Sequence, residues 1–212
     1  MSDAAQRSDD WFAARRGLVT ASRIKDIAKK QKNGSFYATR ETYKNQLIAE
    51  ILTGVSISIP VTAPMQHGMD NENEARAAYA DLGWDEVTEA PFVVHPTISR
   101  AGASPDAFVG DKGLLEIKCP NTTTHVLTLR ENDMPEDHMY QVQWQMACTG
   151  REFCDFMSYD PRLPEKYRVF LKRIPRNASM ISDLEAIVKT FLEEIDAEIK
   201  SLEAKSFRDL TV

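Results

Sequence analysis

Residues 102–120, which read G-A-S-P-D-A-F-V-G-D-K-G-L-L-E-I-K-C-P, constrain the fold of this chain more than any other segment. Two short apolar runs flank a turn-forming stretch at residues 110–113, so we expect a β-hairpin. Successive side chains of a strand point to opposite faces, which places Glu116 and Lys118 on one face of the second run. The hairpin carries Asp106 round toward that face. We therefore expect two carboxylates and an amine in one pocket.

The carboxylates of Asp106 and Glu116 would repel each other unless a positive charge lay between them. Hard divalent cations such as Mg²⁺ are the usual occupants of such an all-oxygen site. A lysine beside the cation can orient or deprotonate a water, or offset charge on a phosphate. By itself, the triplet E-I-K is more typical of solvated charges on an exposed strand, but the preceding S-P-D and the spacing favour a site.

Length and composition indicate one domain. The chain has 212 residues, 42% of them hydrophobic, and we expect a single domain over residues 1–212 with a flexible N-terminus at residues 1–10. We see no apolar run long enough to span a bilayer and no signal peptide, which predicts a cytoplasmic protein that does not bind membranes. Cys119, Cys148 and Cys154 lack CxxC spacing, so we interpret them as buried thiols rather than disulfides or zinc ligands.

Charge is unevenly distributed along the chain. The formal net charge is −6, yet residues 15–44 contain nine basic and two acidic residues. Acidic residues concentrate at 70–74 and from 183 onward. A basic rim over an acidic pocket suits a polyanionic substrate such as nucleic acid, although a solvated charged face explains the segment equally well.

The hydrophobic pattern predicts a mixed α/β fold, a central mixed sheet flanked by helices. Helices are expected at residues 23–30, 39–53, 65–82, 135–149 and 177–204. Strands are expected at 84–88, 91–95, 98–101, in the hairpin, and at 153–159 and 167–172. Thr20 or Ser22 is expected to cap the first helix. The three strands before the hairpin are expected to lead into it as an antiparallel meander.

Asp106, followed after nine intervening residues by Glu116-Ile117-Lys118, resembles the D-x(n)-E-x-K core of restriction-endonuclease-like nucleases. The longer strings G-A-S-P-D and L-E-I-K-C-P are similar to those of the lambda exonuclease family of phage recombination nucleases. Further similar strings are W-x-x-x-R-x-G-x-x-T-A-S at residues 11–22, E-N-E-A-R at 72–76 and Q-V-Q at 141–143. They occur in the family's order over nearly the whole chain. The resemblance implies a restriction-endonuclease-like core.

The resemblance also implies roles for individual residues. The catalytic residues it implies are Asp106, Glu116, Lys118 and Gln141. The ligands it implies for two Mg²⁺ ions, which Mn²⁺ could replace, are Glu72, Asp106, Glu116 and the Ile117 carbonyl. The residues expected to bind the terminal 5′-phosphate are Arg15, Ser22 and Ser104. From the residues alone, Gln141 is equally consistent with a polar helix surface, and Glu72 with a solvated one.

The activity implied by the resemblance is that of a metal-dependent exonuclease. It would degrade linear double-stranded DNA from 5′ ends to mononucleotides and leave 3′ single strands for phage-type recombination by strand annealing. The family forms ring-shaped homotrimers and pairs with a phage single-strand annealing protein in the bacterial host cell. The alternatives are a site-specific endonuclease on the same core and a catalytically silent DNA-binding module.

One departure from the family lies after the C-P dipeptide. Relatives can carry there an arginine that supports the 5′-phosphate pocket, but this chain has Thr124 followed by His125. We consider His125, Arg16 and Arg23 as candidates to compensate.

Overall fold

The structure is a computed structural model that describes residues 8–57 and 60–206. The α-helices are α1 (Asp9–Arg15), α2 (Ile24–Ala28), α3 (Ala38–Thr53), α4 (Ala63–Ala80), α5 (Thr122–Glu131), α6 (Met139–Thr149) and α7 (Ala178–Ser206). The 3₁₀ helices are η1 (Ala21–Arg23), η2 (Glu136–His138) and η3 (Glu165–Tyr167). The strands are β1 (Val19–Thr20), β2 (Val87–Glu89), β3 (Val93–Val94), β4 (Ala101–Ala103), β5 (Ala107–Val109), β6 (Gly113–Lys118), β7 (Phe153–Tyr159) and β8 (Val169–Pro175). The predicted mixed α/β class is confirmed.

The central sheet has five strands in the order β2-β5-β6-β7-β8. β6 and β7 run parallel and the other neighbours antiparallel, so the sheet is mixed as predicted. The β5–β6 hairpin pairs Phe108 with Leu114. In its turn Gly110 has φ +49°, and a Cβ there would lie 2.2 Å from Asp85 Oδ2, which explains why only glycine fits.

The predicted meander is wrong. β3 and β4 belong to a separate three-stranded sheet of order β1-β4-β3, in which β1 runs parallel to β4. Of the three expected strands, only β2 joins the central sheet, where it pairs with β5. Val19 lies opposite Ala101, so the segment after α1 is fixed beside the strand that leads to Ser104.

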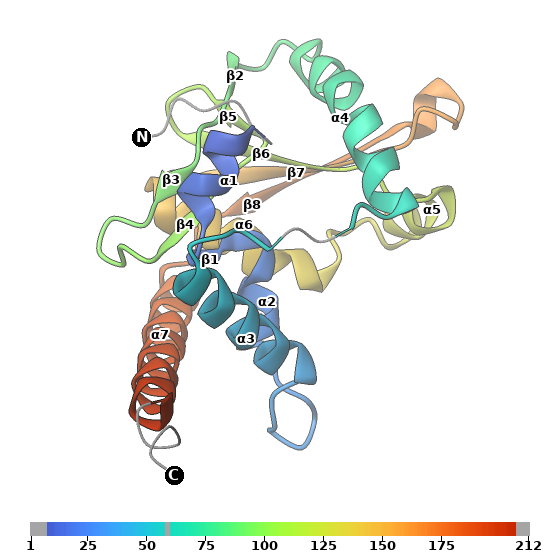
Figure 1. Ribbon diagram of the computed structural model, residues 1–212. Coiled ribbons are helices and arrows are strands. Elements are labelled where there is room, and N and C mark those ends of the chain that lie inside the picture. Colours follow the sequence, from blue (N-terminus) through green and yellow to red (C-terminus); the bar gives the residue numbers. More distant parts are fainter. Residues whose placement is uncertain (1–7, 58–59, 207–212) are drawn as a thin grey trace.

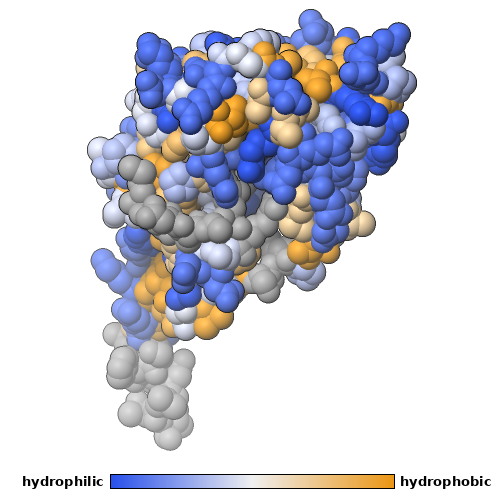
Figure 2. Space-filling view, turned by 90° about the horizontal axis from the view of Figure 1, so that it is seen from above, coloured by the Kyte–Doolittle hydropathy of each residue, from blue (hydrophilic) through white to orange (hydrophobic). Residues whose placement is uncertain are grey.

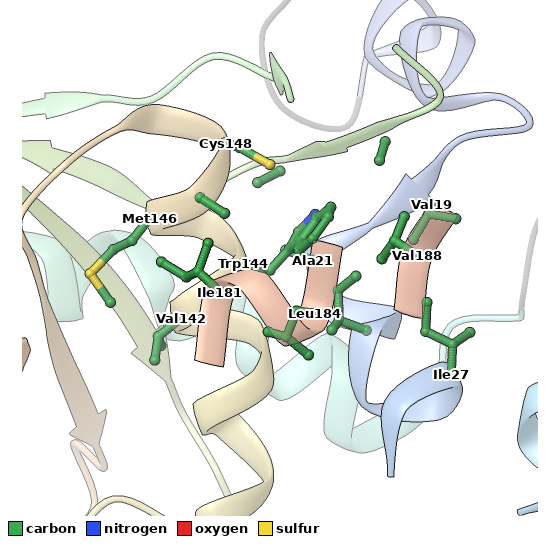
Figure 3. Close-up of a cluster of buried hydrophobic side chains, with 14 of the residues drawn as sticks. Val19, Ala21, Ile27, Val142, Trp144, Met146, Cys148, Ile181, Leu184 and Val188 are labelled. Carbon is green, nitrogen blue, oxygen red and sulfur yellow. The ribbon is translucent and has the colours of Figure 1, made fainter. Parts of the chain in front are cut away.

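Helices cover both faces of the central sheet (Figure 1), and each face carries its own hydrophobic core. One face packs against α6, α7, α2 and α3 around Trp144 and Phe191, both fully buried. Figure 3 shows part of this cluster, with Trp144 between side chains of α7 and of the β1–α2 region. The other face packs against α4 through Ala75 and Tyr79. Because side chains of β6 alternate, Glu116 belongs to the face that α6 covers, whereas Leu115 and Ile117 belong to the face that α4 covers.

The N-terminal boundaries differ from expectation in two places. Residues 1–7 of the expected flexible segment lie outside the described residues. Asp9 and Asp10, however, already belong to α1. Ser8 caps this helix, because its Oγ accepts a hydrogen bond from the Trp11 N–H at 3.2 Å. The expected cap at Thr20 or Ser22 is also wrong, because η1 precedes α2 and Thr20 makes no side-chain cap bond within the described chain.

Ion pairs neutralise much of the basic segment at residues 15–44. Arg40 binds Glu194 of α7 through two contacts of 2.8 Å, and Lys44 lies 2.6 Å from Glu198. Lys25 and Lys29 bind Asp137, and Arg23 binds Asp26. Much of this charge therefore fastens helices together rather than forming an open basic rim.

The face seen from above is mostly hydrophilic, with smaller hydrophobic areas between the polar ones (Figure 2). Such a mixture is ordinary for a surface in contact with water. Across residues 8–57 and 60–206, no helix combines the length and the apolar composition needed to cross a membrane. The three cysteines are free thiols and buried, as predicted.

Candidate active site

Asp106 is fixed to strand β6 at two points. Its backbone N–H donates to the Leu115 carbonyl at 3.1 Å, and its Oδ2 accepts from the Ile117 N–H at 2.6 Å. Both contacts arise because residue 106 immediately precedes β5, which pairs with β6 in the predicted hairpin. The hairpin therefore brings Asp106 beside the E-I-K triplet, as the sequence predicts.

Glu116 is the most enclosed acidic group of the site, with 1% of the residue exposed. Its Oε1 accepts from Gln141 Nε2 at 2.6 Å and also from Lys118 Nζ. Its Oε2 accepts from Gln145 Nε2 at 2.5 Å. A carboxylate removed from water needs such donors, and α6 supplies two of them by packing across β6.

The charges of the site shift the pKa of two groups. Burial, together with the charge of Glu116, raises the pKa of Asp106 well above its usual value, and Glu72 adds to this shift. Burial lowers the pKa of Lys118, but the charges of Glu116 and Asp106 outweigh it, so the pKa is raised overall. Lys118 is therefore an ammonium at neutral and moderately alkaline pH. As it stands it can orient a water but cannot deprotonate one.

Glu72 approaches the site from α4, on the other side of β6. Its carboxylate lies 2.9 Å from the Arg76 guanidinium one turn further along the helix. Its charge contributes to the raised pKa of both Asp106 and the Cys119 thiol, so it lies within electrostatic reach of the site. Among the described residues, no three Asp, Glu, His or Cys side chains converge closely enough to hold a metal ion in this arrangement.

A small cavity of about 180 Å³ opens beside Asp106. Its lining residues are Trp11, Arg15, Ala21, Ser22, Ser104, Asp106 and Gln141. All three residues predicted to bind the 5′-phosphate therefore line the same cavity as two predicted catalytic residues. η1 presents Ser22, α1 presents Arg15, and the β4–β5 connection presents Ser104.

The Arg15 side chain is held from two sides. Its Nη1 donates to Ser104 Oγ at 2.8 Å, and its guanidinium lies 3.9 Å from the centre of the Trp11 ring. Trp11 Nε1 donates to the same Ser104 oxygen at 3.2 Å. Burial lowers the pKa of Arg15 to about 10, opposed by the charges of Tyr43 and Glu50. Arg15 is nevertheless charged at neutral pH and preorganised for an anion.

None of the three candidates to compensate for Thr124 lines this cavity. His125 is fully buried, with Nδ1 2.7 Å from Ser158 Oγ and Nε2 2.8 Å from the Tyr167 carbonyl. Arg16 donates to Ser56 at 3.4 Å, and Arg23 donates to Asp26 at 2.5 Å. In this arrangement none of the three contributes to the cavity, and their role in place of that arginine stays a hypothesis.

Two side chains that hold the site together, Gln145 and Trp11, were not predicted from the sequence. Gln145 shares a helical face with Gln141, which the spacing indicated, but its contact with Glu116 depends on how α6 docks on the sheet. Trp11 was seen only as part of a matching string, whereas its ring and its N–H both support the Arg15–Ser104 pair. By contrast, Gln143 of the Q-V-Q string faces away and bonds the Pro175 carbonyl at 2.9 Å.

A larger open cleft, of about 940 Å³, lies at the opposite face of the central sheet, beside Trp84 and Phe153. Its buried carboxylate, Asp155, is already bound by Arg173 through two contacts of 2.8 Å and by the Tyr79 hydroxyl at 2.5 Å. The smaller cavity, where Asp106, Arg15 and two hydroxyls meet, is therefore the better candidate for chemistry despite its size.

Solved structures of two other proteins share this architecture. The alkaline exonuclease LHK-Exo from Laribacter hongkongensis is 45% identical with a TM-score of 0.87, and the match covers 95% of this chain and 99% of that one. The same protein in complex with dAMP gives a TM-score of 0.88. A phage related exonuclease from Haemophilus somnus 129PT is 15% identical with a TM-score of 0.70 over 87% of this chain and 96% of that one, which shows a shared fold alone. No curated protein matches the chain.

The architecture and the strong likeness to LHK-Exo place this chain in the class of phage-type exonuclease folds. The model of the YqaJ-like viral recombinase domain matches residues 10–152. The chain therefore belongs to the YqaJ-like viral recombinase family, and the resemblance to phage recombination nucleases that the motifs indicated is confirmed.

Proposed function

We propose that the protein is a metal-dependent exonuclease that degrades linear double-stranded DNA from 5′ ends to mononucleotides. The 3′ single strands that remain would serve phage-type recombination by strand annealing. The observation that carries this proposal is the shared cavity: Arg15, Ser22 and Ser104 line it together with Asp106 and Gln141. A seat for a terminal phosphate directly beside the catalytic carboxylate would set the cut close to the end. Family membership and the likeness to an alkaline exonuclease support the proposal.

The seat suits a phosphate because its cation is rigid and desolvated. Arg15 is braced by the Trp11 ring and bonded to Ser104 Oγ, so little side-chain entropy remains to be lost when an anion binds. Ser22 is exposed at the rim of the cavity and can add a neutral hydrogen bond. Binding energy at the terminal phosphate would then align the adjacent phosphodiester for attack.

The donor set fits hard divalent cations. Asp106 and Glu116 are close enough to raise the pKa of Asp106, and a cation between them would relieve this repulsion. Asp106, Glu116, the Ile117 carbonyl and Glu72 would hold two Mg²⁺ ions, with Mn²⁺ as a substitute. When bound, such ions activate a water and stabilise the leaving oxygen. Glu72 would have to exchange its contact with Arg76 for this role.

Lys118 and Gln141 supply the hydrogen bonds of the reaction. Both donate to Glu116 Oε1, so each lies within reach of whatever that oxygen holds. The Lys118 ammonium would orient the attacking water and offset the charge that develops on the phosphate. Gln141 also lines the cavity, which suits it to position the water or the terminal nucleotide.

We carry two further proposals on assembly. The first is a ring-shaped homotrimer around the product strand. The family resemblance supports the trimer. The charge distribution does not, because much of the basic segment is paired within the chain. The second is a phage single-strand annealing protein as partner, which would receive the 3′ strand.

The nearest competing function is a site-specific endonuclease on the same core. Linear and covalently closed circular duplexes of the same sequence would separate the two. An exonuclease consumes the linear DNA and leaves the circle intact. An endonuclease cuts the circle at defined positions, and DNA binding without digestion of either would indicate a silent module.

A further inference from the structure

Gln145 is a polar side chain at a fully enclosed position. It lies on α6 with 0% of the residue exposed, next along the chain to the buried Trp144 and Met146. Burying an amide away from water is unfavourable unless it is hydrogen-bonded. The contact that its Nε2 makes is the one with Glu116 Oε2 at 2.5 Å. The amide is therefore directed at the active-site carboxylate.

Packing alone does not explain a glutamine at this position. Within the described chain, Gln145 Oε1 is buried and accepts no hydrogen bond, which destabilises the fold. A methionine or leucine would fill the same space without this cost. The reverse orientation of the amide would set its oxygen against the carboxylate. The donor that Gln145 offers to Glu116 is thus the property that the position requires.

Gln141 and Gln145 act as a pair because they stand four residues apart on one face of α6. The first donates to Oε1 of Glu116 and the second to Oε2, so the carboxylate plane is held at both ends. Lys118 contacts Oε1 alone. Oε2 therefore faces Gln145, whereas Oε1 faces Lys118 and Gln141, and Gln141 also lines the cavity.

We propose that Gln145 is a positioning residue, which fixes Glu116 through Oε2 and so presents Oε1 for a divalent cation that would take the place of the Lys118 contact. This inference rests on the proposed metal-dependent function. Groups that orient a metal ligand typically change metal affinity about ten- to a hundredfold when removed. Gln145→Met, of similar volume but without a donor, should weaken Mn²⁺ binding by such a factor, measured by calorimetry on the DNA-free protein.

The control is Gln143→Met on the same helix. Gln143 is equally buried but bonds the Pro175 carbonyl and the Asn177 N–H, both away from Glu116. Its replacement should lower the thermal midpoint and leave the Mn²⁺ dissociation constant unchanged. Gln145→Asn, one methylene shorter, should weaken Mn²⁺ binding like Gln145→Met, and serves if the methionine variant does not fold.

A double-mutant cycle, measured as thermal midpoints of the metal-free proteins, provides a second readout. Gln145→Met should shift the midpoint in the wild-type background and have a different effect in a Glu116→Leu background, where no carboxylate awaits the donor. Equal shifts in both backgrounds, with unchanged Mn²⁺ affinity, would overturn the positioning role and leave the exonuclease proposal standing. Failure of the wild-type protein to bind Mn²⁺ at all would overturn both.

Discussion

Arg15 Nη1 donates a hydrogen bond to Ser104 Oγ across 2.8 Å, and so joins residues that are 89 positions apart in the chain. The parallel pairing of β1 with β4 makes this contact possible, because it sets the segment after α1 beside the strand that ends just before Ser104. Ser104 in turn precedes Asp106 by two residues. One contact therefore couples the predicted phosphate seat to the predicted catalytic carboxylate.

The first prediction concerns the end of the DNA. Arg15→Ala should slow digestion of 5′-phosphorylated duplexes about ten- to a hundredfold, because a charged hydrogen bond contributes roughly 1.5 to 3 kcal/mol. On 5′-hydroxyl ends there is no phosphate to lose, so the effect should be much smaller. Initial rates of wild type and variant on both ends give the comparison.

Arg16→Ala is the matched control for this prediction. Arg16 is the next residue, exposed, and bonded to Ser56 rather than to the cavity. Its removal should not change the ratio of rates on the two end types. If Arg15→Ala slows both ends equally, Arg15 only supports the fold or grips internal phosphates, and its end-anchoring role is lost.

The second prediction concerns the catalytic groups. Asp106→Ala, Glu116→Ala and Lys118→Ala should each lower turnover by orders of magnitude, because each removes part of one assembly, while DNA binding persists. Lys112→Ala is a suitable control, since Lys112 is exposed at the hairpin turn and pairs with Glu152. Single-turnover rates and a binding titration measure the two effects separately. Retained turnover in pure Asp106→Ala protein would exclude the site.

The third prediction follows from the raised pKa of Asp106. An acid whose folded pKa exceeds its unfolded value, about 3.9, binds its proton more tightly in the fold. The metal-free protein should therefore lose stability as pH rises from that value through the folded pKa. Asp106→Asn cannot ionise, so its melting temperature should exceed that of wild type by a few degrees above this range and not below it.

Added Mg²⁺ extends this test. It should raise the melting temperature of wild type at neutral pH, where a cation offsets the paired carboxylates, and raise that of Asp106→Asn much less. If the difference in melting temperature between wild type and Asp106→Asn does not vary with pH, the fold does not disfavour the ionised form of Asp106.

The hairpin and the position of its E-I-K triplet were predictable because their signals are local. Glycines mark the turn, and alternation along β6 puts Glu116 and Lys118 on one face, whatever the rest of the chain does. The strand at 153–159 was predicted to the residue for the same reason. Strands as short as β1 and β4 carry no alternation, so their parallel pairing was not foreseen.

Long-range partners explain the remaining errors. The cations at residues 15–44 looked free because their acidic partners, Asp137, Glu194 and Glu198, lie far along the chain. His125 looked available because nothing local shows that α5 buries it against Ser158. Likewise, the reach of Gln145 to Glu116 follows from the docking of α6 on the sheet, which depends on the packing of Trp144 and its neighbours.

The fourth prediction concerns assembly. Light scattering at working concentration should give about three times the chain mass of 24.0 kDa, as the ring proposal requires. Dilution should dissociate the ring before the protomers unfold. A mass near that of one chain at all concentrations would rule out a stable ring.

The most direct test of the central claim is a digestion time course on two preparations of the same linear duplex DNA. One preparation is labelled at the 5′ ends and the other at the 3′ ends. With Mg²⁺, the 5′ label should appear as mononucleotide at the earliest times, while the 3′ label stays on long single strands. A chelator should stop both. Earlier release of the 3′ label, or digestion that continues in chelator, would contradict a metal-dependent enzyme that enters from the 5′ end.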